Sequence, residues 1–216
     1  GNPRQYPTTI DHRHKKTCLF EASPDIATQL RALNALSGFK QELPDGIFLT
    51  HAHIGHYSGL MYLGKEACDA KSVPVYAMPR MRGFLRTNGP WSQLVHNGNI
   101  ALNAIQDSVA TALGNGLRII ALQVPHRDEY SETVGYLIEG PNKKVLFIPD
   151  IDKWESWKED IVHWVKAVDY AFLDATFYSG DEIRQRDLRK IPHPFVLETM
   201  ALFKQEPPAL KDKIWF

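Results

Sequence analysis

The chain has 216 residues, of which 44% are hydrophobic and 23% charged, a composition typical of a globular protein with a substantial core. Its 25 basic and 25 acidic residues balance to a formal net charge of zero, so no global field indicates a nucleic acid or an anionic membrane as partner. No apolar stretch approaches the roughly 20 residues of a membrane-spanning helix, and no signal-peptide pattern is present. We therefore expect a soluble protein with a local site, in a compartment that the sequence leaves open.

Short β-rich runs alternate with helical patterns along the chain, which indicates an α/β fold. The predicted strands are residues 17–21, 46–50, 73–77, 117–124, 133–139, 144–149 and 170–173. A first helix is predicted to begin at Ser23 and Pro24, because a capping serine before a first-turn proline starts helices. Its apolar face carries Ile26, Leu30, Leu33 and Leu36. Further helices are predicted over residues 57–69, 153–167 and 195–204.

The segment 79–116 is rich in glycine, and we expect loops over a surface or cleft there. Without an internal repeat or a Pro/Ser-rich linker, residues 1–216 are predicted to form one domain. The chain starts without methionine and stops at "KIWF", which resembles the start of a strand, so we expect a fragment of a longer chain. Cys18 and Cys68 are too few for a disulfide framework and are predicted to be buried thiols.

Three histidines lie within six residues in "THAHIGHYSGL", directly after the predicted strand 46–50. Loops at the carboxyl ends of strands often carry the sites of α/β proteins. Alternate side chains of an extended segment point the same way, so His51 and His53 can face one point, with His56 at the start of the next helix. Imidazole is the commonest ligand of zinc or iron, so the pattern predicts a metal site rather than unrelated surface or core histidines.

Two later strand ends supply further metal-ligand candidates. His126 follows the predicted strand 117–124, and Asp150 follows the predicted strand 144–149. Two such strand ends after the histidine run favour ligation for both residues. The alternatives are a turn residue after Pro125 for His126 and a helix N-cap for Asp150.

Taken together, these segments resemble the metallo-β-lactamase superfamily. "HAHIGH" is similar to its H-x-H-x-D-H signature, and His126 and Asp150 match its next two motifs in order. The resemblance implies a four-layer αβ/βα sandwich that holds one or two metal ions at one edge, between the two sheets. It implies His51, His53 and His126 as ligands of the first metal, and His56 and Asp150 as ligands of the second, with Asp150 bridging both. The implied cofactor is zinc, as one or two ions, with iron or manganese as alternatives.

Two branches of the superfamily look most similar to this chain. "FEASPDIATQL" and "LTHAHIGHYSGLMYL" resemble the pyrroloquinoline quinone biosynthesis protein B branch. The run "FLDATF" followed by "IPHP" is similar in layout to tRNase Z and to the phosphodiesterase of the carbon–phosphorus lyase pathway. In tRNase Z-like enzymes a histidine placed like His193 assists catalysis, and the last metal-ligand histidine follows one more strand. If "KIWF" is that strand, that ligand lies beyond this sequence, and His193 is a proton donor or phosphate contact rather than a ligand. The alternative for His193 is a loop histidine between Pro192 and Pro194.

Gly55 departs from the signature, which has an aspartate there. In the family this aspartate binds the second metal and helps to orient the attacking hydroxide, and glycine has no side chain to do either. A first site of three histidines remains, and such a site can lower the pKa of bound water to about 7. We therefore expect weaker occupancy of the second site, with Asp150 as the nearest carboxylate for holding the water and His193 as the proton donor to the leaving group.

Other groups near the site have open interpretations. Asp174, at the end of another predicted strand, is expected either to hydrogen-bond a ligand histidine or to cap a helix with Thr176. An anion contact is one interpretation for Arg127 and Tyr130, and exposed loop positions the other. For the basic and aromatic stretch, a solvated helix face is favoured over substrate contact; its residues are Arg80, Arg82, Arg86 and Trp91. Three further tryptophans are expected as core or interface anchors: Trp154, Trp157 and Trp164.

The sequence thus predicts a metal-dependent hydrolase that acts on a small-molecule substrate, with a phosphodiester or related ester weakly preferred. One alternative is an iron-dependent oxidoreductase, because histidine and carboxylate sites also hold iron for oxygen chemistry. The other is a non-catalytic metal-binding protein, in which Gly55 reflects lost activity. Neither the substrate nor the oligomeric state follows from the sequence.

Overall fold

The computed structural model describes residues 8–114, 116–182 and 191–216. Contacts within the chain divide it into two compact units, which are described separately. Unit 1 comprises Gly1–Ile105 and Tyr130–Glu132, and unit 2 comprises Gln106–Glu129 and Thr133–Phe216. The single domain expected over residues 1–216 stays a prediction.

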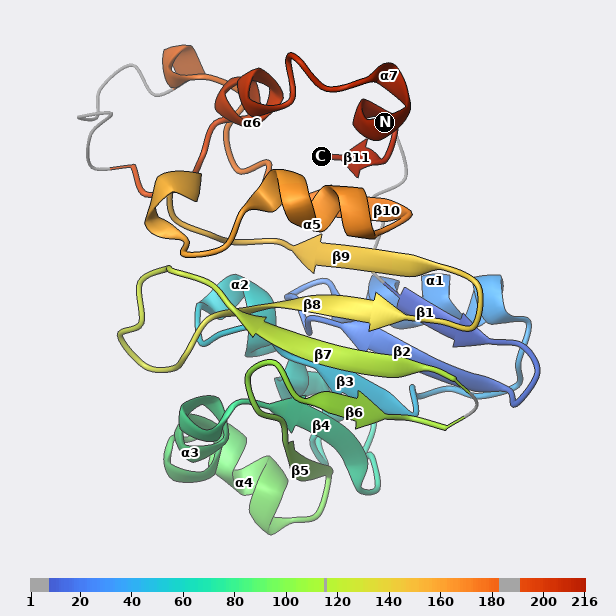
Figure 1. The fold of residues 1–216 in the computed structure, drawn as a ribbon. Helices are drawn as coiled ribbons and strands as arrows, with labels where there is room; N and C mark the ends of the chain where they lie inside the picture. The colour runs from blue at the N-terminus through green and yellow to red at the C-terminus, as the bar shows by residue number, and fades with distance from the viewer. Residues whose placement is uncertain (1–7, 115, 183–190) are drawn as a thin grey trace. The chain divides into compact units, whose positions relative to one another are not determined.

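Unit 1 contains a five-stranded sheet in the order β1-β2-β3-β4-β5 (Figure 1). Its strands are β1 Thr8–Asp11, β2 Lys16–Phe20, β3 Gly46–Phe48, β4 Val73–Ala77 and β5 Ile100–Ala104. β1 pairs antiparallel with β2, whereas β2, β3, β4 and β5 are parallel neighbours. The carboxyl ends of these four strands therefore meet at one edge of the sheet, and β3 leads there into the histidine-rich loop.

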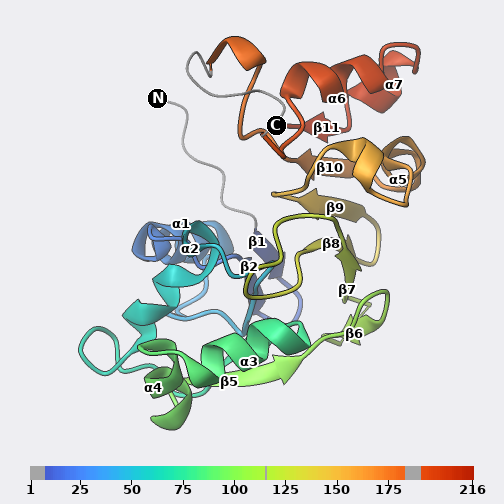
Figure 2. The same cartoon turned by 90° about the vertical axis from the view of Figure 1, so that its left-hand side faces the viewer.

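The helices of unit 1 are α1 Ile26–Ser37, α2 Ile54–Tyr57, the 3-10 helix η1 Ser58–Leu63, α3 Pro79–Thr87 and α4 Trp91–His96. α1 packs against β2, and α3 and α4 pack against β5 (Figure 2). Leu19, Ile47 and Val75 of neighbouring strands form the core with Leu60 of η1. On α1 the predicted apolar face is buried at Ile26 and Leu33 and partly buried at Leu30, but Leu36 is 65% exposed, which corrects that expectation.

Unit 2 contains a six-stranded sheet in the order β11-β10-β9-β8-β7-β6. Its strands are β6 Ala110–Ala112, β7 Arg118–Gln123, β8 Val134–Glu139, β9 Lys144–Ile148, β10 Tyr170–Leu173 and β11 Ile214–Trp215. Neighbours from β6 to β9 are antiparallel, and β10 lies parallel to both β9 and β11. The parallel strands β9 and β10 therefore end at the same edge, directly before Asp150 and Asp174.

The helices of unit 2 are the 3-10 helix η2 Trp154–Ser156, α5 Ile161–Ala167, the 3-10 helix η3 Gly180–Glu182, α6 Val196–Leu202 and α7 Pro208–Lys211. α5 packs against β9, and its N-cap Asp160 accepts a hydrogen bond from the backbone N–H of Val162. Trp154 and Trp157 are buried in the core of the unit, and Trp164 packs against it. The prediction that the three tryptophans anchor a core is confirmed.

All seven predicted strands are present within two residues of their expected ends, as is the strand expected at "KIWF". The helix predicted over 57–69 is wrong, because the chain forms the short α2 and the 3-10 helix η1. A Cβ at Gly59 would lie 2.1 Å from the carbonyl oxygen of Ser23, so this segment runs tightly against the chain before α1. The helix over 153–167 is divided into η2 and α5.

The expectation of loops throughout 79–116 is also wrong, since α3, α4, β5 and β6 lie there. The α3 N-terminus is fixed by a distant group: the carboxylate of Glu132 accepts hydrogen bonds from the backbone N–H of Arg80 and, at 3.4 Å, of Met81. Of the two cysteines, Cys18 is buried as predicted, but Cys68 is exposed.

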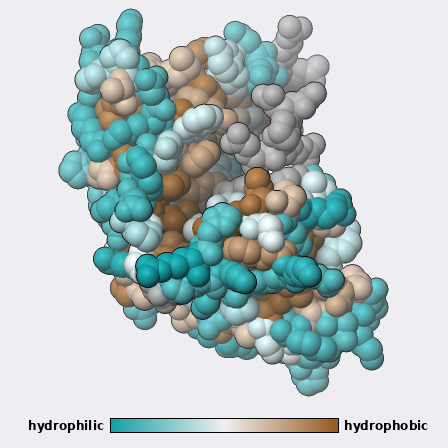
Figure 3. Space-filling view, turned by 90° about the vertical axis from the view of Figure 1, so that its right-hand side faces the viewer, coloured by the Kyte–Doolittle hydropathy of each residue, from teal (hydrophilic) through white to brown (hydrophobic). Residues whose placement is uncertain are grey.

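Among the described residues, no helix has the length and apolar character that crossing a membrane requires. Hydrophilic side chains cover much of the face in Figure 3, with hydrophobic residues exposed among them. The exposed apolar side chains include Met200 of α6 and Trp215 and Phe216 at the end of the chain.

Candidate metal centre

The three histidines of the 51–56 loop lie close together in unit 1. His51 Nε2 is 2.9 Å from His53 Nδ1, and the centroids of the His51 and His56 rings are 4.2 Å apart. His51 follows β3, His53 precedes α2, and His56 lies within α2. The extended backbone of His53, with φ −95° and ψ 140°, directs alternate side chains to one side, as the H-x-H spacing predicts.

Side-chain oxygen atoms contact the Nδ1 atoms of His51 and His56. Thr50 Oγ1 lies 2.9 Å from His51 Nδ1, and Glu21 Oε2 lies 2.6 Å from His56 Nδ1. The other carboxylate oxygen of Glu21 accepts the backbone N–H of Thr50 at 2.9 Å. Sequence reasoning missed Glu21. Its signal was an acidic residue at the end of the apolar run "CLFE", where burial needs a partner.

A second group missed in the sequence, Ser131, binds the middle of the loop. Its hydroxyl accepts the backbone N–H of Ala52 at 2.8 Å and donates to the carbonyl of Glu132 at 2.8 Å. Only four residues separate Ser131 from His126 in the sequence. No local pattern marks Ser131, because its partner is 79 residues away.

Gly55 lies in α2, and its backbone has no left-handed φ. A Cβ built there would meet no heavy atom within 4 Å. Neither backbone conformation nor lack of space therefore requires glycine at this position. A side chain can therefore begin at this position without a clash at its Cβ.

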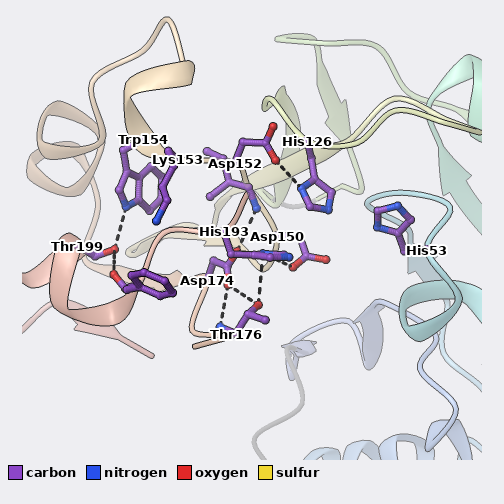
Figure 4. Close-up of polar contacts among 12 residues, drawn as sticks. His53, His126, Asp150, Asp152, Lys153, Trp154, Asp174, Thr176, His193 and Thr199 are labelled. Carbon is purple, nitrogen blue, oxygen red and sulfur yellow. Dashed lines mark hydrogen bonds and ion pairs between the residues drawn. The ribbon is translucent and has the colours of Figure 1, made fainter. Parts of the chain in front are cut away.

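Unit 2 gathers a second cluster from four segments: His126 after β7, Asp150 after β9, Asp174 after β10, and His193 before α6 (Figure 4). The His126 and His193 ring centroids are 5.1 Å apart. One ligand atom each of Asp150, Asp174 and His193 lie within 4.8 Å of one another. The structure thus brings the His126, Asp150 and His193 of the sequence prediction together within this unit.

Asp174 is almost fully buried and is bonded on both carboxylate oxygens. Oδ2 accepts from His193 Nδ1 at 2.7 Å and from the backbone N–H of Ile151 at 3.2 Å. Oδ1 accepts from the backbone N–H of Thr176 at 2.9 Å and from its hydroxyl at 2.7 Å. Asp174 thus bonds Thr176 without capping a helix, and its histidine partner is His193, which was assigned from the sequence to proton donation rather than to the metal. The carboxylate fixes the His193 ring and the segment directly after Asp150.

Asp152 is the partner of His126 and was missed in the sequence. Its Oδ1 lies 3.1 Å from His126 Nδ1, and its backbone N–H donates to the carbonyl of Pro125 at 2.7 Å. A histidine that donates its Nδ1–H to a carboxylate keeps the lone pair on Nε2, which is the form that binds a metal. The signal was the D-x-D spacing in "PDID".

Electrostatics separate the two histidines of unit 2. Burial lowers the pKa of His126, and the nearby charge of Asp150 and the hydrogen bond to Asp152 offset this only in part, so its pKa lies below the usual value. Burial also opposes protonation of His193, but the hydrogen bond to Asp174 and the charges of Asp174 and Asp150 together raise its pKa. His126 thus favours the neutral form that metal binding needs, and His193 favours the protonated form.

The donor atoms fit a divalent metal ion. Imidazole nitrogens and carboxylate oxygens suit zinc, and also iron and manganese. The Nδ1 atoms of His51, His56 and His126 each contact an oxygen of a neighbouring side chain, the arrangement that orients histidine ligands and strengthens them. Each unit therefore offers ligands with the support that metal-binding histidines have.

The other candidate groups lie as follows. Arg80 and Arg86 are exposed on α3, which favours the solvated helix face over a binding role. Trp91 is buried and its ring contacts Tyr57. Tyr130 is 62% exposed and its ring centroid lies 5.6 Å from that of Phe84.

Comparison with known proteins gives the family. Residues 16–211 match the model of the beta-lactamase superfamily domain. No curated protein matches the chain significantly. Among solved structures, Zn²⁺-bound PqqB from Methylobacterium extorquens is similar with a TM-score of 0.69 and 20% identity, over 87% of this chain and 67% of that one.

Two further structures are similar at the level of the fold. A diphosphatase of the PhnP family has a TM-score of 0.56 and 18% identity, over 88% of this chain and 65% of its own. Human tRNase Z, short form, has a TM-score of 0.59 and 14% identity, over 94% of this chain and 83% of its own. The chain thus spans about two thirds of the length of the first two.

These matches include both branches expected from the sequence, and they confirm the expected fold class. Each unit, a sheet with helices packed on it, has the content of one half of an αβ/βα sandwich. The family match covers nearly the whole chain. The chain belongs to the beta-lactamase superfamily.

Proposed function

We propose that this chain is the metal-binding part of a hydrolase that cleaves a phosphodiester or related ester in a small molecule. The observation that carries this proposal is the histidine loop of unit 1, in which the rings of His51, His53 and His56 gather. Oxygens contact the Nδ1 atoms of His51 and His56, the arrangement that orients metal-binding histidines. The solved relatives in the family include a diphosphatase and a tRNase, which supports hydrolysis.

The residues that we assign to the metal are those that the family resemblance implies. We assign His51, His53 and His126 to the first ion, and His56 and Asp150 to a second, weaker position, with Asp150 shared. Zinc is the preferred ion because the similar PqqB structure contains it, with iron or manganese as alternatives. A bound divalent ion supplies a hydroxide nucleophile near neutral pH and polarises the bond to be cleaved.

The chain's own residues then have separate tasks. Asp174 accepts the Nδ1–H of His193, so the Nε2–H of the protonated ring is the proton available to a leaving group. The raised pKa of His193 extends the pH range over which the ring holds that proton beyond that of an ordinary imidazole. Asp150 lies 3.5 Å from His193 Nδ1 and adds negative charge that stabilises the protonated ring.

The proposal is tested by assaying the zinc-loaded protein against bis(p-nitrophenyl) phosphate, p-nitrophenyl acetate, a lactone and a thioester. We expect hydrolysis of at least one phosphodiester or ester, loss of it on chelation, and recovery on adding zinc. His53→Ala should reduce the rate to background, whereas His163→Ala, which removes an exposed histidine of α5, should not change it.

The two other functions give different results. Iron in the purified protein together with oxygen consumption would favour an oxidoreductase. Stoichiometric metal without turnover of any compound in the panel would favour a metal-binding protein without hydrolase activity. Activity that survives both chelation and His53→Ala would contradict the proposal.

A further inference from the structure

We propose that Glu21 is the positioning residue of the histidine loop, and that its carboxylate supports metal binding in place of the one missing at position 55. This inference rests on the proposed function. Glu21 follows β2 and comes from a chain segment about 30 residues before the loop. Its side chain contacts the loop at its beginning and near its end.

One carboxylate reaches both sides of the loop. Oε1 accepts the backbone N–H of Thr50 at 2.9 Å, and the Thr50 hydroxyl in turn lies 2.9 Å from His51 Nδ1. Oε2 lies 2.6 Å from His56 Nδ1. Glu21 therefore acts directly on one candidate ligand, His56, and through Thr50 on another, His51.

The backbone around Glu21 is fixed by several hydrogen bonds. Its own N–H donates to the carbonyl of Phe48 at 2.9 Å, and the next N–H, of Ala22, donates to the carbonyl of His56 at 2.8 Å. The φ angle of Glu21 is 70°, in the left-handed region that residues other than glycine seldom adopt. Such a conformation persists only where the surroundings hold it, so the carboxylate is directed at the loop with little freedom.

The chemistry explains why a carboxylate is needed. A negative oxygen on Nδ1–H fixes the tautomer and makes Nε2 a stronger ligand. In the H-x-H-x-D-H signature the residue directly before the last histidine is an aspartate. In this chain that position is Gly55, which has no carboxylate to place beside His56. Glu21 gives His56 an anionic partner without itself being placed at position 55.

The test uses Glu21→Gln, which keeps the shape and one oxygen acceptor but removes the charge. Zinc affinity is measured by competition with a chromophoric chelator, and zinc content by elemental analysis. We expect the affinity to fall by about 10- to 100-fold, the range found for partners of metal ligands. Thermal unfolding of the zinc-free protein should stay close to that of the parent.

Asp45→Asn is the matched control. Asp45 accepts the backbone N–H of Thr17 at 2.8 Å, at the opposite end of β2, so this variant also removes a carboxylate bonded to the same strand. Its zinc affinity should equal that of the parent. Glu21→Gly distinguishes the effect of losing the carboxylate from that of the backbone conformation, because glycine adopts φ 70° freely. It also removes the acceptor of the Thr50 N–H, which counteracts the relief of the backbone strain, and it should bind zinc at least as weakly as Glu21→Gln.

The outcomes distinguish the two proposals. A parent protein that binds no metal would overturn the proposed function and this inference with it. A parent that binds zinc, with Glu21→Gln and Glu21→Gly binding equally well, would overturn only the role of Glu21. A loss of affinity in Asp45→Asn as large as in Glu21→Gln would also overturn it, since any lost carboxylate on β2 would then have the same effect.

Discussion

The two units build their clusters in different ways. In unit 1, three imidazoles come from six consecutive positions and have one carboxylate among them, that of Glu21. In unit 2, two histidines from distant segments lie among three carboxylates, those of Asp150, Asp152 and Asp174. Imidazole nitrogens dominate the first cluster and carboxylates the second. The comparison suggests a division of labour, with metal binding centred on unit 1 and proton transfer on unit 2.

Of the variants that test this difference between the units, His193→Ala should have the largest effect, which is on the rate of hydrolysis. If His193 donates a proton to the leaving group, the rate should fall by about 100- to 10,000-fold for an ester with an alkyl leaving group. A p-nitrophenyl ester should be affected far less, because p-nitrophenolate leaves without a proton. Steady-state kinetics on both esters measure this, and zinc content should not change.

His163→Ala again serves as the control on kinetics. An equal loss for both leaving groups, or a loss of zinc in His193→Ala, would assign His193 to the metal rather than to proton transfer.

Gly55→Asp sharpens the comparison by adding a carboxylate to unit 1. Since a Cβ there meets nothing within 4 Å, the free energy of unfolding should change by less than about 1 kcal/mol. The zinc content should rise from near one ion per chain toward two, as measured by elemental analysis. Gly55→Asn, nearly the same shape without charge, should leave it near one. Equal metal content in both variants and the parent would show that position 55 does not limit the second ion.

How much the sequence predicts differs between the clusters for a physical reason. The unit 1 histidines were predictable because a strand and the loop after it are adjacent in sequence, and H-x-H spacing carries the geometry of extended backbone. His126 and Asp150 were identifiable as strand ends. Their partner Asp152 and the Asp174–His193 contact depend on how strands and loops approach each other, which single-sequence patterns do not encode.

Prediction of the helices and strands was limited in the same way by contacts between residues that are far apart in the sequence. All seven predicted strands formed because their apolar runs are buried in the two sheets. The helix face favoured for Arg80 and Arg86 is present on α3, but the start of α3 was not predicted, because its N-terminal N–H groups are capped by Glu132, about 50 residues away. Glu21 was missed because an acidic residue directly before Ala-Ser-Pro is more typical of an exposed turn than of a buried site.

A smaller effect is expected from a variant that removes the hydrogen bond between Trp154 and Thr199, near the unit 2 cluster. The indole N–H of Trp154, four residues after Asp150, donates to Thr199 Oγ1 of α6 at 2.8 Å, and both side chains are buried. Thr199→Val keeps the shape but leaves the indole N–H unsatisfied, so the free energy of unfolding should fall by about 1–3 kcal/mol. Urea unfolding measures the change. Thr199→Ser, which keeps the hydroxyl, should lose less, and equal losses would contradict this account of the contact.

The smallest effect concerns the thiols, both in unit 1. Burial, and secondarily the charge of Asp45, raise the pKa of Cys18 to about 12, so its reactive thiolate is absent at neutral pH. A thiol reagent should label Cys68 rapidly and Cys18 only after unfolding. Because the unfolded thiol titrates near 9.0 and the folded one near 12, stability should fall as the pH rises between these values. Rapid labelling of both native thiols would contradict the burial of Cys18.

The central proposal is that His51, His53 and His126 are metal ligands, and zinc titration of two single variants tests it most directly. His53→Ala removes a histidine of unit 1, and His126→Ala removes one of unit 2. The account predicts that each variant alone loses the tightest zinc site of the parent, while His96→Ala, an exposed histidine of α4, keeps it. Undiminished tight binding in His126→Ala, together with its loss in His53→Ala, would contradict the assignment of His126 as a ligand.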